Sequence, residues 1–546
     1  MEFSMELYDV DEAKQHTNPS SSAANDGDDR ISGLGDDVLL HILGLLRDAR
    51  DLLPTGVLSR QWRGLWRRVP ALTFSPWPQQ LTDSASFAQQ RYIAFVSDVL
   101  SLRAKSSDAI ERLAISLVIY NSCGKHLVPS SIGAAERWIQ YAVRQGVKSF
   151  DLKLLPDEED RGRKKKTRDR GDRERFAMAL DELLLPSSAK LETLRLDLSN
   201  AIVRLPATVV LPSLVDLTLE SVEVTGDSGD SGGSNPFAGL LSSPRLQKLR
   251  LYDITLTGFQ EMLLIESASL VELSLENMYE MESLDLRTPN LRVLRIEDCK
   301  DIEALTVSAP RLEELELSSN PSLVHIEGEL CCSRLNNLGL SSHGCMANGN
   351  DRSTHLLQHC SSVRDLTLSL TLKRNKWRCI DIIKGRVPQL PNVTSLAIEV
   401  CLPREQHSLL GDSLATLLTG FNNLRYLDIQ LYSSYNPYQR AGVPFDVDAG
   451  TSTSLSDRTY GCSPNKILSL VHLQEAKFRG LIESEDCELP FLQSVLAGAR
   501  NLRKVVVCFD AEYSRKSGRD EFRHMLLGGG TWTPCRDACE SYEWRP

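Results

Sequence analysis

The segments SLVELSL (269–275), NLRVLRI (290–296) and RLEELEL (311–317) repeat one pattern, Leu-x-x-Leu-x-Leu, in which Ile takes the last place once. Their first leucines, Leu270, Leu291 and Leu312, follow one another at intervals of 21 residues. Alternating apolar residues are typical of a short strand with one buried face. A constant interval means that each strand returns to the same place in a repeating unit. The sequence therefore predicts a row of strands that share one core.

Weaker copies of the pattern extend this row in both directions, with longer and less regular connections. They bring the total to about fourteen units, and an interval near 21 residues is typical of leucine-rich repeats. Asn or Cys at the ninth position of such a repeat bonds the turn backbone; Cys299, Asn320 and Cys401 occupy it. The weaker copies begin at Ile110, Val147, Leu191, Leu214, Leu246, Leu335, Val363, Val393, Leu424, Leu473 and Leu502.

Helical segments between the units complete the predicted fold class, which is α/β. AAERWIQYAV (134–143) and RERFAMALDELL (173–184) have amphipathic helical patterns, so we expect strands on the concave side and helices on the convex side of an irregular solenoid over residues 100–470. Polar insertions near 161–173, 225–236 and 432–464 interrupt the repeat and are expected to be loops.

The N-terminal part follows a different pattern. Residues 1–28 are acidic and polar, a composition that favours a disordered tail. Helical spacing then relates Leu39, Ile42, Leu43 and Leu46, and a second helical stripe contains Trp62, Leu65, Trp66 and Val69. Two short helices in so small a segment need a neighbour or a partner for stability.

Residues 29–74 resemble the F-box of plant F-box/leucine-rich-repeat proteins. The resemblance rests on DRISGLGDDVLLHIL (29–43) and VLSRQWRGLW (57–66), which occur in the family's order and separation. Two positions depart from the family. Gly35 stands where proline is usual, and Pro54 interrupts what is usually a short helix. Residues 471–546 resemble the FBD region of such proteins, which would cap the repeats.

The resemblance implies a substrate-recognition subunit of a Skp-cullin-F-box ubiquitin ligase, with a Skp-type adaptor and, through it, a cullin scaffold as partners. It also implies that other subunits perform the ubiquitin transfer, so that this chain is not an enzyme. The family's adaptor contacts carry over to Leu34, Asp36, Val38, Leu39, Ile42, Val57, Leu58 and Trp62. Charged residues beside the repeat leucines are expected on the concave, target-binding side; they are Glu272, Arg292, Arg295, Glu314 and Glu316.

The composition of the chain argues against nucleic acid and membrane as partners. With 62 Lys and Arg against 73 Asp and Glu, the net charge of −11 gives no general attraction to nucleic acid or anionic membrane. We expect neither partner. No run of eighteen apolar residues and no leader pattern occur, and the 13 cysteines show no CxxC pairs. A cytoplasmic and/or nuclear location is expected.

The remaining motifs give little support for catalysis, a cofactor or a metal. No nucleophile, phosphate-binding or metalloprotease motif occurs. His343, Cys345, His355, His359 and Cys360 lack the close ligand pairs of a zinc site. The basic run at 163–168 is either a nuclear localisation signal, a patch for an acidic target or a solvated loop.

Two alternatives to the ligase hypothesis stay open from the sequence. Gly35 and Pro54 allow a degenerate F-box, in which case the chain would be a non-ligase interaction scaffold. A small molecule bound in the solenoid could also complete the target surface. The identity of the target cannot be read from the sequence, because repeats bind proteins of every kind.

Overall fold

The structure is a computed structural model that contains two compact units, Met1–Val69 (unit 1) and Pro70–Pro546 (unit 2). The boundary lies before residues 71–74, which the sequence placed with the F-box segment. Residues 1–28 and most of the expected loops lie outside the described residues. The structure describes residues 34–46, 48–76, 85–106, 108–119, 127–156, 177–180, 190–205, 210–225, 235–258, 262–318, 320, 323, 325–328, 332–341, 357, 362–371, 388–402, 410–433, 468–481, 488–509, 519–527, 529–535 and 541–546.

Unit 1 is helical. It contains α1 (Asp36–Gly44), α2 (Ala49–Leu52) and two 3-10 helices, η1 (Leu53–Val57) and η2 (Trp62–Arg68). The Asp48 side chain accepts a hydrogen bond from the Arg50 backbone N–H at 2.8 Å and so caps α2. Pro54 lies in the first turn of η1, directly after α2 ends. A proline ring cannot continue the α-helical hydrogen bonds, which explains the change of helix type there.

The apolar stripe predicted around Trp62 is buried in the core of unit 1, whereas the stripe predicted around Leu39 is only partly buried. Trp62, Leu65, Trp66 and Val69 are all buried, although the first three lie in a 3-10 helix and Val69 follows it. In α1, Leu39 and Leu43 are fully buried, whereas Ile42 and Leu46 are each 37% exposed. The α1 stripe is therefore wider than the core of unit 1 needs.

Unit 2 is dominated by an 18-stranded sheet, here sheet A. Fifteen of its strands form one continuous parallel series, in which each strand pairs with the next member along the chain. They are β1 (Ala71–Phe74), β2 (Arg112–Ile119), β3 (Ser149–Pro156), β5 (Thr193–Arg204), β6 (Asp216–Thr225), β7 (Lys248–Thr257), β9 (Glu272–Glu276), β11 (Val293–Glu297), β13 (Glu314–Ser318), β15 (Arg334–Ser341), β16 (Asp365–Thr371), β17 (Ser395–Leu402), β18 (Tyr426–Ser433), β19 (Glu475–Leu481) and β20 (Lys504–Phe509).

A ladder of backbone hydrogen bonds fixes the register of these strands. The carbonyl of the residue just before each strand accepts two N–H groups from the next unit; Val271 O, for example, accepts from Arg292 at 2.9 Å and Val293 at 3.1 Å. The same arrangement runs from Pro70 O to Gln474 O. It confirms every predicted unit start except Leu335, which is wrong because Leu335 pairs with Leu315. That unit begins at Cys332, a buried residue in the leucine position.

A second parallel sheet lies behind the middle of sheet A. It consists of β8 (Met262–Glu266), β10 (Ser283–Arg287), β12 (Ala304–Ser308) and β14 (His325–Glu327). Leu273 and Leu275 of sheet A and Leu284 and Leu286 of the second sheet are among the fully buried residues of the core. The expectation of helices behind the strands is therefore wrong over residues 262–327, where short strands take that place.

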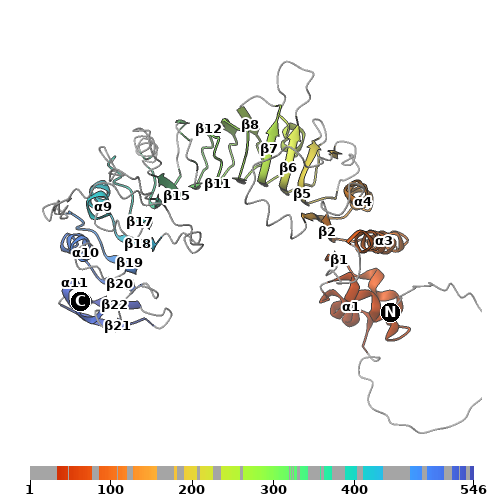
Figure 1. Cartoon of the computed structure of the whole chain (residues 1–546), viewed down its shortest axis with the longest axis horizontal. Helices are drawn as coiled ribbons and strands as arrows, with labels where there is room; N and C mark the ends of the chain where they lie inside the picture. Colours follow the sequence, from red (N-terminus) through yellow and green to blue (C-terminus); the bar gives the residue numbers. More distant parts are fainter. Residues whose placement is uncertain are drawn as a thin grey trace, which may run out of the picture. The chain divides into compact units, whose positions relative to one another are not determined.

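Helices accompany the two end regions of unit 2 (Figure 1). They are α3 (Ala85–Ala104), α4 (Leu127–Arg144), α7 (Ala238–Leu241), α9 (Leu410–Leu418), α10 (Glu488–Ala497) and α11 (Arg519–Leu526). The helix predicted at 134–143 is confirmed within α4. The helix predicted at 173–184 is wrong at Ala177–Ala179, which form strand β4 paired with β5. Within the described residues, no helix has the length and apolar character required to cross a membrane.

Two short antiparallel strands close the C-terminal edge of sheet A. β22 (Ser541–Arg545) pairs antiparallel with β20, and β21 (Thr531–Pro534) pairs with β22. The buried Arg523 side chain of α11 stacks on the Tyr542 ring of β22 at 3.5 Å. This contact packs α11 against the added strands at the C-terminal edge of sheet A.

The ninth position of the repeat joins neighbouring units. The Asn320 side chain accepts a hydrogen bond from the Cys299 backbone N–H at 3.0 Å and donates one to the Ile296 carbonyl at 2.8 Å. The Cys299 thiol itself donates to the Leu275 carbonyl at 3.8 Å. Both residues therefore bond turn or strand backbone, as predicted. The side chain of Cys401 lies outside the described residues.

Candidate functional site

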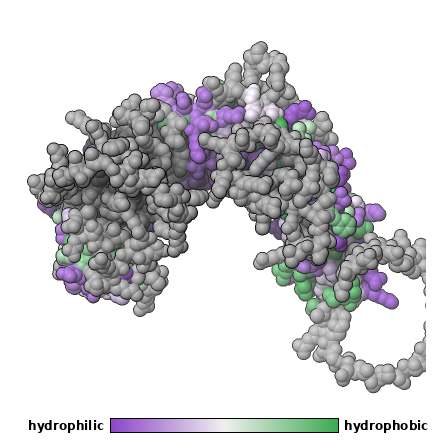
Figure 2. All heavy atoms as spheres, viewed as in Figure 1, coloured by the Kyte–Doolittle hydropathy of each residue, from purple (hydrophilic) through white to green (hydrophobic). Residues whose placement is uncertain are grey.

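Unit 1 exposes several large apolar side chains. Val57 is 88% exposed and Leu58 is 68% exposed, and Val38 and Ile42 of α1 are also exposed. Leu45 and Leu46, which the sequence did not single out as contacts, are exposed as well. Figure 2 shows hydrophobic side chains gathered on the part of the chain that holds α1. So many apolar groups on so small a unit are typical of a protein-binding surface.

The local structure of α1 explains why one apolar set faces outward. Val38 and Ile42 are four residues apart, so they lie on the same side of the helix. Leu39 and Leu43, each one residue further along, have the same spacing and are fully buried. One helix thus presents an apolar pair to the core of unit 1 and another to the solvent.

The beginning of α1 is held by the end of unit 1. The Gln61 amide donates to the Leu34 carbonyl at 2.9 Å and to the Asp36 carboxylate at 3.3 Å. Arg68 forms an ion pair with Asp36 at 2.9 Å. Both partners of this ion pair are largely exposed, so its contribution to stability is small. Its effect is to fix where α1 begins.

The eight predicted adaptor contacts therefore fall into three groups by their exposure. Val38, Ile42, Val57 and Leu58 are exposed apolar side chains, and Asp36 is exposed but ion-paired. Leu34 is half-buried. Leu39 and Trp62 are buried within unit 1, so a partner would reach them only through a change in that unit.

The predicted target residues lie on or beside the outward face of sheet A. Glu272, Arg295, Glu314 and Glu316 alternate along their strands with buried leucines and isoleucines. Arg292 comes directly before β11. Figure 2 shows a hydrophilic surface along this part of the chain.

Ion pairs connect these charges across neighbouring strands. Arg295 lies 3.3 Å from both Glu314 and Glu316, and Glu272 lies 3.0 Å from Lys248 and 3.4 Å from Arg250. The sequence placed these residues on one face but did not predict that they neutralise one another. Register explains it, because opposite charges occupy matching positions of adjacent strands.

Carboxylates accumulate at the ends of the same strands. Partial burial raises the pKa of Glu297, and the neighbouring charges of Glu276, Glu316 and Asp298 raise it further. Asp298 and Asn277 take a left-handed backbone conformation directly after their strands. Their short polar side chains tolerate this conformation, which lets each chain turn out of sheet A.

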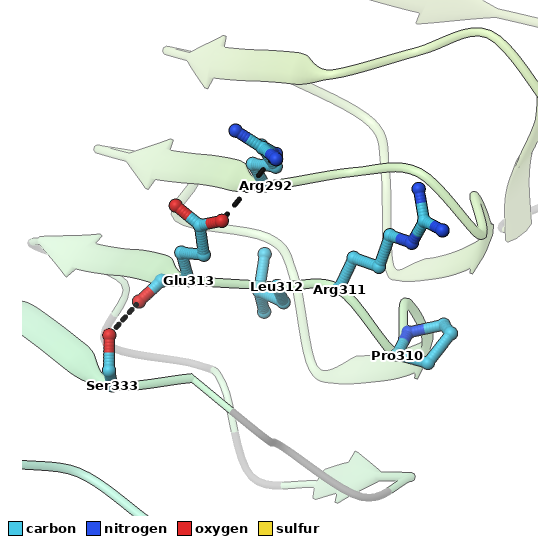
Figure 3. Close-up of a pocket in the computed structure, with 6 residues that line it drawn as sticks. All are labelled: Arg292, Pro310, Arg311, Leu312, Glu313 and Ser333. Carbon is cyan, nitrogen blue, oxygen red and sulfur yellow. Dashed lines mark hydrogen bonds and ion pairs between the residues drawn. The ribbon is translucent and has the colours of Figure 1, made fainter.

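A shallow pocket of about 370 Å³ lies at the opposite ends of the strands, where β11, β13 and β15 begin. Figure 3 shows that Arg292, Glu313 and Ser333 project from the same position of three successive units. Arg292 and Glu313 form an ion pair at 3.5 Å, and the Ser333 hydroxyl donates to the Glu313 carbonyl at 3.2 Å. Pro310, Arg311 and Leu312 complete the lining.

The described cysteines and acidic groups form no evident reactive centre. Burial raises the pKa of the Cys299 thiol to about 12, so the thiol is protonated and bonds backbone. Among the residues that the structure describes, no three His, Cys, Asp or Glu side chains group as metal ligands would. The five His and Cys residues at 343–360 lie outside that set.

Several known proteins from Arabidopsis thaliana resemble this chain. One F-box/FBD/LRR-repeat protein is 30% identical over 231 residues, which are 41% of each chain. A second is 28% identical over 200 residues, 37% of this chain and 39% of the relative. An FBD-associated F-box protein is 35% identical over 124 residues, 23% of this chain and 25% of the relative.

These matches span about two fifths of the length of the first two relatives. No family model matches the chain. The names of the relatives agree with the motifs at residues 29–74, the repeats and the C-terminal region. The comparisons thus confirm the resemblance of this chain to plant F-box/leucine-rich-repeat proteins of the FBD type.

Proposed function

We propose that this chain is a substrate-recognition subunit of a Skp-cullin-F-box ubiquitin ligase. In this role unit 1 binds a Skp-type adaptor, and the repeats of unit 2, arranged as a leucine-rich-repeat solenoid, bind the protein to be ubiquitinated. The relatives' names support the coarser part of this role, an F-box-type protein that binds other proteins.

The observation that carries the proposal is the exposed apolar surface of unit 1. Val38 and Ile42 on α1, together with Val57 at the end of η1 and Leu58 directly after it, remain in water, whereas Leu39 and Leu43 fill the core of unit 1. Burying a side chain of this size against a partner contributes roughly 1.5–3 kcal/mol. A surface of this kind suits an apolar partner such as an adaptor.

Unit 2 supports the second half of the proposal. Its parallel ladder holds fifteen strands in one register and displays a row of polar side chains along sheet A. Extended sheets of repeats provide broad binding surfaces for proteins. In the proposed complex the chain supplies proximity between target and ligase, and the chemistry belongs to other subunits.

The experiment is co-purification of the full chain with a purified Skp-type adaptor, followed by titration calorimetry. We expect submicromolar binding that Val38→Asp with Ile42→Asp weakens at least a hundredfold, because charge on an apolar contact must be desolvated. Met262→Asp is the matched control, since Met262 is an exposed apolar residue of unit 2. Leu39 is unsuitable for this test, because Asp at a fully buried position would unfold unit 1.

Two results would decide against the proposal. Adaptor binding that the α1 variant leaves unchanged would exclude the exposed apolar surface as the contact. No adaptor binding by a folded parent chain would favour the alternative, an interaction scaffold with a degenerate F-box. Gly35 and Pro54 are the features behind that alternative, and Pro54 stands where the helix changes type.

We also propose a cytoplasmic and/or nuclear location, without nucleic acid or membrane as a partner. Cys299 and Cys508 are free thiols, which suits a reducing compartment. Fluorescent tagging with cell fractionation tests this location, and accumulation in the secretory pathway would overturn it.

A further inference from the structure

The residue directly before each strand of sheet A defines a row on the surface of unit 2, which we call the pre-strand row. Its backbone is fixed by the hydrogen-bond ladder, so successive members lie on successive strands. Figure 3 shows three members, Arg292, Glu313 and Ser333. The row continues through Arg364, Thr394, Arg425, Gln474 and Arg503, which precede β16, β17, β18, β19 and β20.

The charges in this second half of the row are of one sign. Arg364, Arg425 and Arg503 are all exposed. No ion pair joins them to another residue that the structure describes, in contrast to Arg292, which pairs with Glu313. We call these three residues the basic ridge. It is a local positive surface on a chain whose net charge is −11.

The spacing of the basic ridge follows from the sheet. Its arginines stand before β16, β18 and β20, which are alternate strands because β16, β17, β18, β19 and β20 pair in that order. Neighbouring strands are about 4.8 Å apart, so consecutive arginines are about 10 Å apart. An extended peptide in the polyproline II conformation advances about 3.1 Å per residue and has three residues per turn, so every third side chain lies on the same side at nearly this spacing.

The side chains between the arginines suit a peptide laid across the strands. Thr394 and Gln474 are uncharged and can donate and accept hydrogen bonds. Tyr426, the first residue of β18, is 46% exposed beside Arg425. Exposed Tyr and Arg are enriched where binding energy concentrates. The acids adjoining the ridge are Asp365, which pairs with Arg334 at 3.5 Å, and Glu475.

We propose that the basic ridge binds an extended, anionic segment of the target protein, with acidic or phosphorylated residues at every third position. This inference rests on the proposed target-binding role of unit 2 and names the chemistry of its partner. It also moves the expected contact away from Glu272, Arg295, Glu314 and Glu316, whose charges are compensated within sheet A.

Fluorescence anisotropy with short labelled peptides and the full chain tests the proposal. One peptide carries three glutamates at every third position, a second carries the same glutamates in one block, a third has phosphoserine in the spaced positions, and a fourth has lysine there. We expect the spaced phosphoserine peptide to bind tightest, because each phosphate carries nearly two charges. The spaced glutamate peptide should follow, then the block, and the lysine peptide should not bind.

Arg364→Gln, Arg425→Gln and Arg503→Gln together should weaken binding roughly tenfold or more, since each exposed charge contact is worth up to about fivefold. The matched control removes the same charge from three exposed arginines elsewhere in unit 2, as Arg112→Gln, Arg144→Gln and Arg245→Gln. Its affinity should equal that of the parent chain.

The proposal is overturned if the ridge variant binds the spaced peptide as tightly as the parent chain, or if the lysine peptide binds equally well. A single-stranded oligonucleotide that needs the ridge, while no acidic peptide binds, would instead assign it to nucleic acid. Adaptor titration of the same variants separates the two proposals. Intact adaptor binding without any peptide binding would refute only the proposal for the basic ridge. Ridge-dependent peptide binding without adaptor binding would refute only the proposed ligase role.

Discussion

Replacing Asn320 by alanine should destabilise the middle of unit 2 by about 1–3 kcal/mol. The substitution deletes the acceptor for the Cys299 N–H and the donor to the Ile296 carbonyl. Cys299 and Ile296 are themselves fully buried. A buried backbone group that loses its partner costs about 1–3 kcal/mol, and the Cys299 N–H is such a group, whereas the Ile296 carbonyl lies within the pairing of β11 with β13. The loss should be local, because each repeat contacts only its neighbours.

Hydrogen exchange of the full chain measures this prediction at the Cys299 amide, and chemical denaturation measures the global effect. Asn290→Ala is the control, since the Asn290 amide makes an exposed bond to the Ala268 carbonyl at 2.7 Å and should cost no more than about 1 kcal/mol. Equal losses in the two variants, or unchanged protection of the Cys299 amide in Asn320→Ala, would refute the reasoning. Protection in unit 1 should not change in either variant.

Three further substitutions test other features. Glu297→Gln should raise the melting temperature at pH 7 and lose this advantage below about pH 4.5. A carboxyl whose pKa is raised in the folded state destabilises that state once the pH exceeds the pKa of the unfolded chain. An equal gain at pH 4 would contradict this prediction. Gly480→Ala should cost several kcal/mol in urea denaturation, since φ is +76° and a Cβ would lie 2.1 Å from the Leu431 carbonyl oxygen, whereas Gly529→Ala, with nothing within 4 Å, should cost little. Gly35→Pro should slow amide exchange in α1 by stabilising unit 1 about 0.4–1 kcal/mol, because Gly35 already has φ −65° and ψ 155°; faster exchange would show that its N–H is needed.

The repeating strands could be predicted from the sequence because their signal is local. Leu270, Leu291 and Leu312 recur at one interval, and the leucines that follow each of them alternate with polar residues. The unit at Cys332 was placed three residues late because a buried cysteine occupies the leucine position there. A pattern built on leucine takes the next leucine, Leu335, as the start.

The second sheet was not predicted, for a physical reason that its strands make clear. SLDLR (283–287) and ALTVS (304–308) alternate as the strands of sheet A do, and they have five residues each, like the neighbouring β9, β11 and β13, but they lack the first leucine of the repeat pattern. Each of these strands lies on the connection between two consecutive strands of sheet A. That connection is too short to hold a stable helix. The interval of 21 residues contained this information, since longer intervals elsewhere in unit 2 leave room for α3, α4 and α9.

The candidate contacts of unit 1 were predicted only as a mixture of core and surface. Helical spacing relates Leu39, Ile42 and Leu43, yet Ile42 is exposed and the two leucines are buried. Helical periodicity identifies apolar residues on one side of a helix. It does not show whether that side packs against the same chain or against a partner. The structure separates these cases because it shows which side the rest of unit 1 covers.

Stability and partner choice depend on different residues of unit 2. The ladder is made by backbone groups and the core by leucines at alternate strand positions, so neither constrains the side chain directly before a strand. Arg292, Glu313 and Ser333 occupy that position in consecutive units with equivalent backbone hydrogen bonds. A substitution there should therefore change what the surface binds at little cost in folding free energy, typically within about 0.5 kcal/mol. A deletion inside a strand should act in the opposite way, since a shift of one residue would turn buried leucines toward solvent.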